Sequence, residues 1–406
     1  MRGRLQLLVG TVVLASCAAE ESVPVVFTVA DSAGVQVVAT EISKWESEPS
    51  WVLSTEPAVR IGAMEGDDPY LFADIAGVVG LADGRIVVAD GLSREIRFFS
   101  SAGEFVRSVG GTGDGPGEYA DIAWIARCGE GLQVFSRRHR RLTSLTLDGD
   151  LIETALLETP GEGSVPYRSR CGPDGSLVLS GWGVQPEMRP DVTFQFFGQE
   201  APVWWLPLAD GDPIALGNYI SSERVLHYDP TTGRGGSGPH PFGRAVSFAI
   251  GRAIYIGNAD RLQVEERDRA GRLVRLMRGP DDDLLVDDEF LAEYRSLHLS
   301  GLDSVRRARL DDNEMPMPTR LPAYTEIRID PLGYIWVERF RAPWDERSRW
   351  GVFQAEGEFL GHVELPSHFQ LLDIAASAVL GVSRDDFDIE RVEVYQLERG
   401  TTPPPA

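Results

Sequence analysis

The sequence predicts an all-β fold made of repeated four-stranded sheets, and two observations support this prediction. The first is an internal repeat, because the segment 59–75 is echoed by the segment 106–122. The second is a pair of glycine turns in each repeat, such as those at Gly84 and Gly103, with β-forming residues on both sides. Glycine supplies the positive φ that a tight hairpin turn requires. Two hairpins, and therefore four short strands, fit each repeat.

The two turns recur along the chain and indicate how many sheets there are. The earlier turn of a repeat contains Gly84, Gly131, Gly175, Gly251 or Gly333, and the later turn contains Gly103, Gly149, Gly271 or Gly357. Repeats of about 40–45 residues with four strands are typical of the blades of a β-propeller. Two stretches, 207–241 and 279–321, interrupt the pattern and are interpreted as insertions. The remainder accommodates six blades, near 72–110, 119–157, 165–206, 242–278, 322–364 and 366–399.

The two ends of the repeat region predict how the ring closes. The last repeat ends after 391–397 without a fourth strand, whereas a spare strand at 51–62 precedes the first repeat. We expect this N-terminal strand to complete the last blade, because pairing the ends in one sheet removes an exposed edge. The predicted domain is thus a six-bladed β-propeller of four-stranded antiparallel blades over 51–399. Residues 18–50 are expected to form an N-terminal tether and strand, and 400–406 a proline-rich tail.

The first 17 residues predict export. Arg2 and Arg4 precede an apolar run, Leu5–Ala15, that is too short to span a bilayer. The string Leu14-Ala15-Ser16-Cys17 resembles the lipobox of bacterial lipoproteins, in which the cysteine becomes the lipidated first residue. This resemblance implies a membrane anchor at Cys17 and a place in the cell envelope, on the periplasmic or outer-membrane face. The alternative is an ordinary cleaved signal that contains a cysteine.

The other two cysteines occupy similar positions in neighbouring repeats. They stand in the strings Arg127-Cys128-Gly129 and Arg170-Cys171-Gly172, each just before a turn. Cysteine pairs outside the cytoplasm are often oxidised. A disulfide between Cys128 and Cys171 is therefore a candidate, and two buried free thiols are the alternative, since a bridge requires Cα atoms within about 7 Å.

One stretch of the first repeat resembles a known repeat family. The resemblance lies in the run 84–90 followed by Arg94, Ile96, Phe98, Gly103 and Phe105, which is similar to an NHL-type repeat. The chain after its signal sequence resembles the six-bladed β-propeller lipoproteins of several bacterial phyla, a largely uncharacterised family. The asparagine that NHL repeats usually carry before the arginine is replaced by Ser93 and His139. The resemblance implies the fold and implies no activity.

Charge and composition restrict the partners. The chain carries 62 acidic and 39 basic residues and a formal charge of −23, which disfavours nucleic-acid binding. Its six histidines show no metal-ligand spacing. We therefore expect no metal, no cofactor and no catalytic residues, and we expect a monomer. A metal-dependent hydrolase, lactonase or lyase of the propeller type is the alternative function.

Basic and aromatic residues concentrate in the longer connections. In a propeller the tight glycine turns lie on one face, and the longer connections form the opposite face, here called the loop-rich face. This face is where propellers usually bind partners. The candidate ligand-binding residues on it are Arg94, Arg137, Arg138, His139, Arg140, Arg141, Trp182, Arg189, Arg339, Arg341 and Trp344.

These residue types suit a binding surface. Guanidinium groups bind carboxylates or phosphates through two-point contacts, and indole rings stack on sugars or cations. The composition predicts a platform for an anionic ligand, a glycan or a segment of an envelope protein. The alternative is that the arginines pair with carboxylates of neighbouring blades.

Overall fold

The computed structural model describes most of the chain. The described residues are 27–46, 48–161, 166–189, 191–207, 211–229, 231–280, 283–300 and 317–400. The predicted signal sequence with Cys17 and the tail from residue 401 lie outside them. None of the helices in the described part is both long and apolar enough to cross a membrane.

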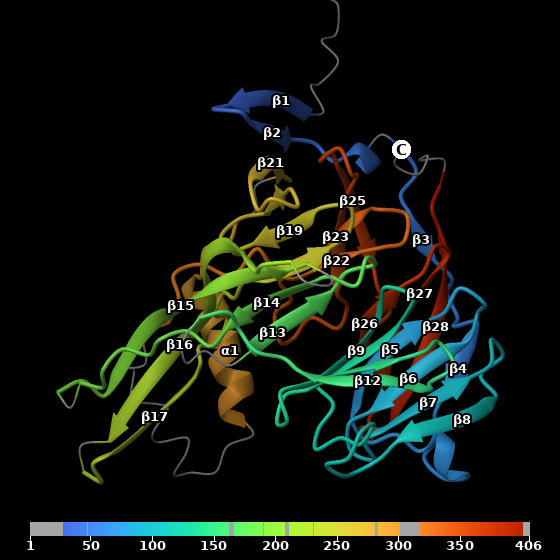
Figure 1. Cartoon of the computed structure of the whole chain (residues 1–406). Helices are drawn as coiled ribbons and strands as arrows, with labels where there is room; N and C mark the ends of the chain where they lie inside the picture. The colour runs from blue at the N-terminus through green and yellow to red at the C-terminus, as the bar shows by residue number, and fades with distance from the viewer. Residues whose placement is uncertain are drawn as a thin grey trace, which may run out of the picture.

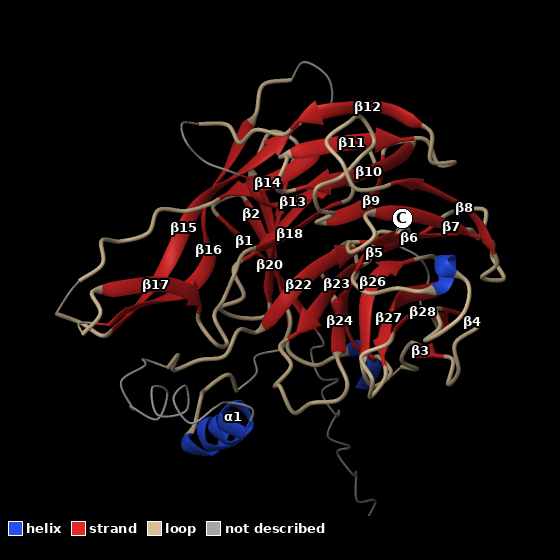
Figure 2. Cartoon of the chain, turned by 90° about the horizontal axis from the view of Figure 1, so that it is seen from below, coloured by secondary structure: helices blue, strands red, loops and turns tan. Residues whose placement is uncertain are grey.

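The chain folds into a six-bladed β-propeller, with six sheets of mainly antiparallel strands arranged around a central axis (Figures 1 and 2). The first strand of each sheet lies nearest the axis, and later strands lie further out. The first blade contains β5 (Ile75–Gly80), β6 (Ile86–Asp90), β7 (Glu95–Phe99) and β8 (Phe105–Gly110). The second contains β9 (Trp124–Cys128), β10 (Gly131–Ser136), β11 (Arg141–Leu145) and β12 (Leu151–Leu156).

The remaining blades follow in chain order. The third contains β13 (Pro166–Cys171), β14 (Leu177–Gly181), β15 (Phe194–Leu206), β16 (Ile214–Asp229) and β17 (Arg234–Pro239). The fourth contains β18 (Ser247–Ile250), β19 (Ile254–Gly257), β20 (Gln263–Arg267) and β21 (Leu273–Arg278). The fifth contains β22 (Tyr324–Ile329), β23 (Ile335–Arg339), β24 (Arg349–Phe353) and β25 (Phe359–Glu364). The sixth contains β26 (Phe369–Ile374), β27 (Ala378–Arg384) and β28 (Glu390–Glu398).

The hydrophobic core is divided among the contacts between blades. Each pair of neighbouring blades encloses its own cluster of buried apolar side chains, including the pair formed by the sixth and first blades. The second strand of a blade is buried on both faces, as β6 shows. A strand that is buried on both faces has apolar residues at successive positions, which explains the uninterrupted apolar run at 86–89.

The last blade is closed by the N-terminal part of the chain, which confirms the predicted closure. Strands β4 (Val59–Ile61) and β3 (Val52–Leu53) both pair antiparallel with β28. Ile61 is only 1% exposed. The Nε of Arg60 donates a 2.7 Å hydrogen bond to the buried carboxylate of Glu393. The two ends of the ring are thus joined by backbone pairing, apolar packing and an ion pair.

The segment before β3 is more structured than the predicted tether. Strands β1 (Phe27–Ser32) and β2 (Val35–Thr40) form a hairpin, and β2 pairs in parallel with β21 at the outer edge of the fourth blade (Figure 1, top). The chain then crosses the fifth blade, where Thr40 Oγ1 accepts a hydrogen bond from the Phe359 N–H and Ser43 Oγ donates one to the Leu360 carbonyl. This segment therefore connects the fourth, fifth and sixth blades.

The interpretation of 207–241 as an insertion is wrong. The stretch supplies β16 and β17, the fourth and fifth strands of the third blade. Strands β15 and β16 pair over most of their length and form an arm that projects from the ring (Figure 1, lower left). The proline and glycine residues of this stretch suggest loops, but several of them lie within strands, such as Gly217 in β16 and Gly235 in β17.

The described residues of the stretch 279–321 lie outside the strands of the six blades. Its described part contains one helix, α1 (Asp288–Ser300). Asp287 Oδ1 accepts a 2.8 Å hydrogen bond from the Phe290 N–H and caps the first turn. The acidic run before the helix therefore has a local structural role.

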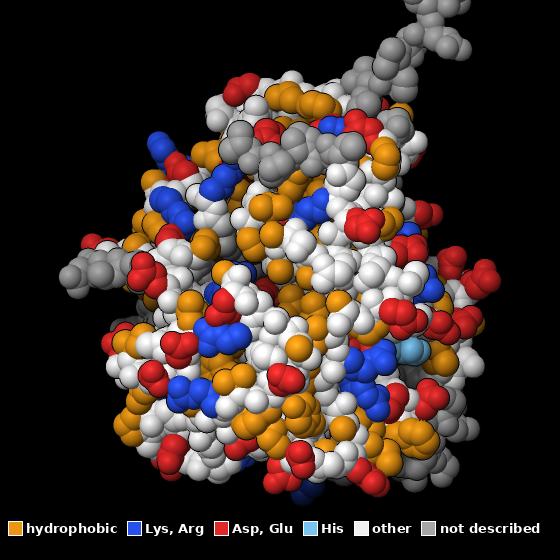
Figure 3. Space-filling view, turned by 90° about the vertical axis from the view of Figure 1, so that its right-hand side faces the viewer, with side chains coloured by type: hydrophobic (Ala, Val, Ile, Leu, Met, Phe, Trp, Pro, Cys, Tyr) orange, Lys and Arg blue, Asp and Glu red, His pale blue; other side chains and the backbone are white. Residues whose placement is uncertain are grey.

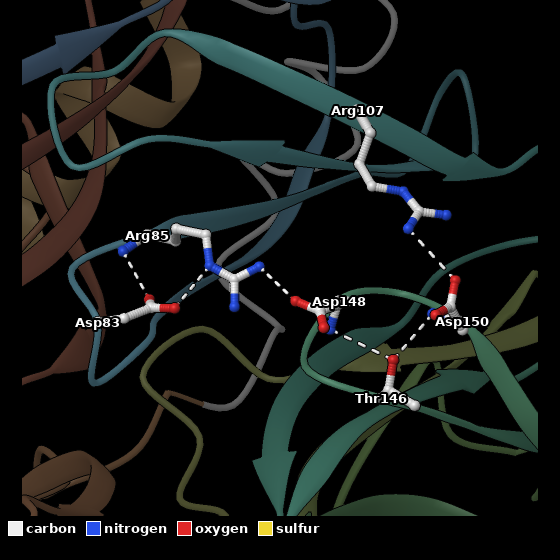
Figure 4. A network of polar contacts seen from close by, with 6 residues as sticks. All are labelled: Asp83, Arg85, Arg107, Thr146, Asp148 and Asp150. Carbon is white, nitrogen blue, oxygen red and sulfur yellow. Dashed lines mark hydrogen bonds and ion pairs between the residues drawn. The ribbon is translucent and has the colours of Figure 1, made fainter.

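Tight turns connect the first and second blades on the face opposite the loops. Arg85 donates hydrogen bonds to Asp83 and Asp148, and Arg107 donates one to Asp150 (Figure 4). These side chains are partly or largely exposed, so each pair contributes little to stability. Gly149, which lies in the same turn, packs directly against Phe98 of the first blade.

Candidate functional site

The hairpin between β10 and β11 is the most basic part of the loop-rich face. Asp121 fixes its conformation, because one carboxylate oxygen accepts hydrogen bonds from Ser136 Oγ at 2.7 Å and from the Arg138 N–H at 2.9 Å. Arg140 adopts a positive φ of 52° at the turn. The basic residues are thus held on a rigid hairpin.

The basic hairpin contains both paired and unpaired side chains. His139 Nε2 lies 2.8 Å from an Asp114 carboxylate oxygen, and Arg141 Nη1 donates to the Asp114 carbonyl at 2.6 Å. The side chains of Arg137, Arg138 and Arg140 are exposed. None of their guanidinium groups forms a hydrogen bond or ion pair with another described residue. The counter-ion alternative therefore does not describe these three.

The other arginines predicted for this face have several different environments. Arg94 donates to Thr112 Oγ1 at 2.8 Å, and Arg189 pairs with Asp191 at 3.0 Å. Arg339 is buried, and burial together with the charge of Arg349 lowers its pKa to about 10. Arg341 is exposed. Arg94 contacts the loop 111–119, which also holds His139 and Arg141 through Asp114. The other three residues come from the third and fifth blades, and no contact connects them with the basic hairpin in the described structure.

The two tryptophans differ in the same way. Trp182 is 40% exposed, lies edge-to-face with Tyr167 at 4.5 Å between ring centroids, and is covered by the guanidinium of Arg224 at 5.1 Å. Trp344 packs against Phe290 of α1 at 4.8 Å between centroids. Trp182 is therefore available to a ligand, whereas Trp344 seats the helix.

One side of the molecule has no single dominant charge. Figure 3 shows basic and acidic side chains interspersed on one side of the molecule, with apolar side chains between them. Because the chain carries a net charge of −23, a local group of unpaired arginines stands out against this background. The basic hairpin is such a group.

A second candidate lies on the propeller axis. A cavity of about 600 Å³ is lined by residues of the six innermost strands, β5, β9, β13, β18, β22 and β26. Residues of four tight turns also line it, including Gly129, Pro173, Gly251 and Gly333. The cavity therefore opens on the tight-turn face, opposite the basic hairpin. We call it the axial cavity.

Charged groups converge in the axial cavity. Glu326 Oε1 lies 2.8 Å from Arg170 Nη2 and 3.0 Å from Arg328 Nη2. Arg127 is exposed, and its guanidinium makes no hydrogen bond with another described residue. Asp373 Oδ2 accepts a 2.9 Å hydrogen bond from the Gly80 N–H. Four arginines and two aspartates line the cavity, and Glu326, which pairs with two of these arginines, is not itself part of the lining.

Burial acts differently on the carboxylates of Glu326 and Asp373. Burial acts to raise the pKa of Glu326, but Arg328 and Arg170 outweigh it, and the pKa is lowered. Burial raises the pKa of Asp373, and the charges of Arg127 and Arg328 offset this rise only in part. Glu326 is therefore held as a carboxylate, while Asp373 accepts a proton more readily than an exposed aspartate.

A disulfide fixes the spacing of two of these arginines. Cys128 and Cys171 are bonded, with their Cα atoms 5.5 Å apart, so the bridge joins β9 to β13 across neighbouring blades. Each cysteine directly follows an arginine of the cavity, Arg127 or Arg170. The repeated Arg-Cys-Gly string is the sequence feature that could have indicated this site, but from the sequence we interpreted only its cysteines.

A metal centre has no obvious place in the described structure. The described residues contain no group of three or more histidine, cysteine, aspartate or glutamate side chains arranged to hold a metal ion. A further cavity, of about 670 Å³, borders the third and fourth blades near Phe196 and Leu284. On its wall Glu223 and Arg244 form an ion pair of 2.7 Å and satisfy each other.

Comparisons with known proteins support the fold. Residues 62–159, which span the first two blades, match the family model DUF5128, described as a 6-bladed beta-propeller. The expected resemblance to six-bladed propellers is confirmed. A comparison with curated protein sequences finds no match.

Solved structures with a similar course of the chain have low sequence identity. A Bacteroides fragilis protein described as exported has a TM-score of 0.48 and 9% identity, over 89% of this chain and 98% of that one. A DUF4221 family member from Bacteroides vulgatus has a TM-score of 0.48 and 12% identity, over 87% and 100%. A gluconolactonase from Xanthomonas campestris has a TM-score of 0.42 and 13% identity, over 80% and 88%. At this level of similarity the neighbours carry no argument about activity.

Proposed function

We propose that the protein is a lipid-anchored, extracytoplasmic binding protein that holds an anionic partner on its loop-rich face. The supporting observation is the group formed by Arg137, Arg138 and Arg140. Three exposed guanidinium groups without partners among the described residues are available for two-point contacts with carboxylates or phosphates. A partner in the cell envelope would be an acidic peptide segment or an anionic glycan.

The rigidity of the basic hairpin favours binding. Asp121 fixes the turn through two hydrogen bonds, and His139 and Arg141 attach it to the neighbouring loop through Asp114. A surface that is already ordered loses less conformational freedom on binding, which leaves more of the interaction energy as affinity. The paired members of the run therefore support the unpaired ones.

Replacement of the three unpaired arginines tests the proposed surface. We expect the triple variant Arg137→Ser/Arg138→Ser/Arg140→Ser to bind fluorescent poly-glutamate at least tenfold more weakly, with Tm almost unchanged, because these side chains make no protein contacts that folding requires. The control is Arg272→Ser, because Arg272 lies on the tight-turn face and its side chain is 78% exposed. Its poly-glutamate binding is compared with that of the single variant Arg138→Ser. A clear fall in Tm would support a structural role, and unchanged binding would refute the proposed surface.

Export and anchoring rest on residues 1–17, which are tested separately. We expect Cys17→Ser to abolish incorporation of radiolabelled palmitate and to move the protein from the membrane fraction to the soluble fraction. The matched control is Ser16→Ala, which keeps a small residue before the cysteine. Retention of Cys17→Ser in the membrane fraction would refute lipid anchoring without affecting the proposed binding surface.

A further inference from the structure

The axial cavity combines apolar walls with convergent arginines. Apolar side chains from five of the innermost strands line it, among them Val78, Ile125, Ile250, Ile327 and Ile374. Its volume of about 600 Å³ lies within the usual range for pockets that bind small molecules. A pocket with mostly apolar walls and a few convergent polar groups suits an organic molecule that has a charged end.

The charges in the cavity do not balance. Glu326 is shared by Arg170 and Arg328, and Asp373 accepts a backbone hydrogen bond. The four arginines of the lining outnumber its two aspartates, so the lining carries an excess of positive charge in a strongly acidic protein. The guanidinium of Arg127 has no hydrogen-bond partner among the described residues, although its charge acts on Asp373.

One buried donor of a lining arginine also lacks a partner. The Nε–H of Arg328 is buried and has no hydrogen-bond partner in the described structure. Buried polar groups without partners are uncommon in folded proteins, and each one calls for an explanation. Because this Nε atom has almost no accessible surface, a ligand in the cavity would not reach it, and the exposed Arg127 remains the available donor.

The other charged residues at the cavity rim are already satisfied. Arg252 contacts the Ala355 carbonyl and lies 3.9 Å from Glu266. Asp330 is fully buried and forms a 2.7 Å ion pair with Arg399. These residues already have partners, which leaves Arg127 as the lining arginine that a ligand would meet without displacing a protein contact.

We propose that the axial cavity binds a small carboxylate with an apolar body, with Arg127 and Arg170 holding the carboxylate. The disulfide between the residues that follow these two arginines keeps their backbones at a fixed separation. The isoleucine and valine walls hold the apolar body. This site lies on the face opposite the basic hairpin and does not depend on the function proposed for that hairpin.

A series of straight-chain carboxylates tests the proposal. Acetate, butanoate, hexanoate and octanoate are titrated calorimetrically into the full chain in lipid nanodiscs, with empty nanodiscs as the blank and inorganic phosphate as a further probe. We expect affinity to rise severalfold for each added pair of CH₂ groups, because each buried CH₂ contributes a favourable transfer free energy. Phosphate should bind at least tenfold more weakly than octanoate. Equal affinity across the series, phosphate included, would overturn the proposed ligand class.

Variants of the arginines locate the site. Arg127→Gln should weaken octanoate binding at least tenfold without lowering Tm, because Arg127 has no hydrogen bond to lose. Arg138→Gln, in the basic hairpin, should leave octanoate binding unchanged. Equal octanoate affinity in Arg127→Gln and the parent protein would refute the site, whereas loss of poly-glutamate binding alone would concern only the loop-rich face.

Discussion

The disulfide between Cys128 and Cys171 offers a quantitative test of how the ring is held together. The bridge closes a segment with a sequence separation of 43 residues. In the chain-entropy treatment, a loop of this length restricts the unfolded chain by about 13 cal/mol/K, or about 4 kcal/mol at 25 °C. The double variant Cys128→Ser/Cys171→Ser should lose stability of this order.

The expected change in melting temperature follows from the size of the protein. At average values per residue, the unfolding entropy of a chain of 406 residues is about 0.85 kcal/mol/K. A loss of about 4 kcal/mol in the free energy of unfolding therefore lowers Tm by about 5 °C. The measurement is thermal unfolding followed by circular dichroism, with and without a reductant. Reductant should lower Tm in the parent protein and have no effect on the double variant.

Two results would refute this reasoning. A double variant as stable as the parent would mean that the bridge constrains neither the folded nor the unfolded chain. A parent protein that is insensitive to reductant, with two thiols that react with a thiol reagent, would mean that the bond is not formed. Because the bridge also sets the spacing of Arg127 and Arg170, the double variant should bind octanoate more weakly than the parent.

The remaining predictions concern three single sites. Gly149→Ala should lower the free energy of unfolding in urea by about 2–4 kcal/mol, because φ is +87° and a Cβ would lie 2.7 Å from Phe98. The control Gly34→Ala, at φ +84° with open space around it, should lower it by only about 1 kcal/mol. Equal losses in the two variants would exclude the packing contribution. Asp373→Asn should raise Tm at pH 7, because burial raises the pKa of this carboxyl and the folded state disfavours its charge. The gain in Tm should disappear below that pKa, and the variant should bind octanoate more tightly. A lower Tm at pH 7 would contradict the argument. Burial, with the charges of Arg339 and Arg349, lowers the pKa of His362 to about 4. The unfolded chain therefore binds more protons between pH 6.5 and 4, and about 3 kcal/mol of stability is lost as pH falls through this window. His362→Gln should remove this part of the dependence of stability on pH, and an unchanged dependence would refute the argument.

The fold was predictable because its signals are local. A glycine turn, and a continuous apolar run such as 86–89, are encoded within a few residues, and their repetition counts the blades. The closure by β4 was predictable because one blade lacked a strand. The pairing of β2 with β21 and the strand β16 were not predictable in this way, because both depend on partners or extensions that the local pattern of residues does not specify.

The axial cavity was missed for a related reason. An arginine in a short strand suggests a solvent-facing position, and the sequence does not show which face of an innermost strand points to the axis. Arg127 and Arg170 were noticed only because cysteines follow them. Among the residues that were predicted, Arg137, Arg138 and Arg140 kept their place as a candidate surface, whereas Trp344 and Arg339 proved to be packed into the protein.

The ties between blades explain how unpaired arginines can be maintained. The disulfide joins the second and third blades, the N-terminal segment joins the fourth to the sixth, and β4 joins the sixth to the first. A ring constrained at these places cannot relax easily to bring a carboxylate to Arg127 or to the basic hairpin. Such groups stay unpaired because the backbone holds them apart from their counter-ions, and a ligand that brings its own anion meets donors that are already positioned. Loosening the ring should therefore weaken binding at both faces before it unfolds the protein.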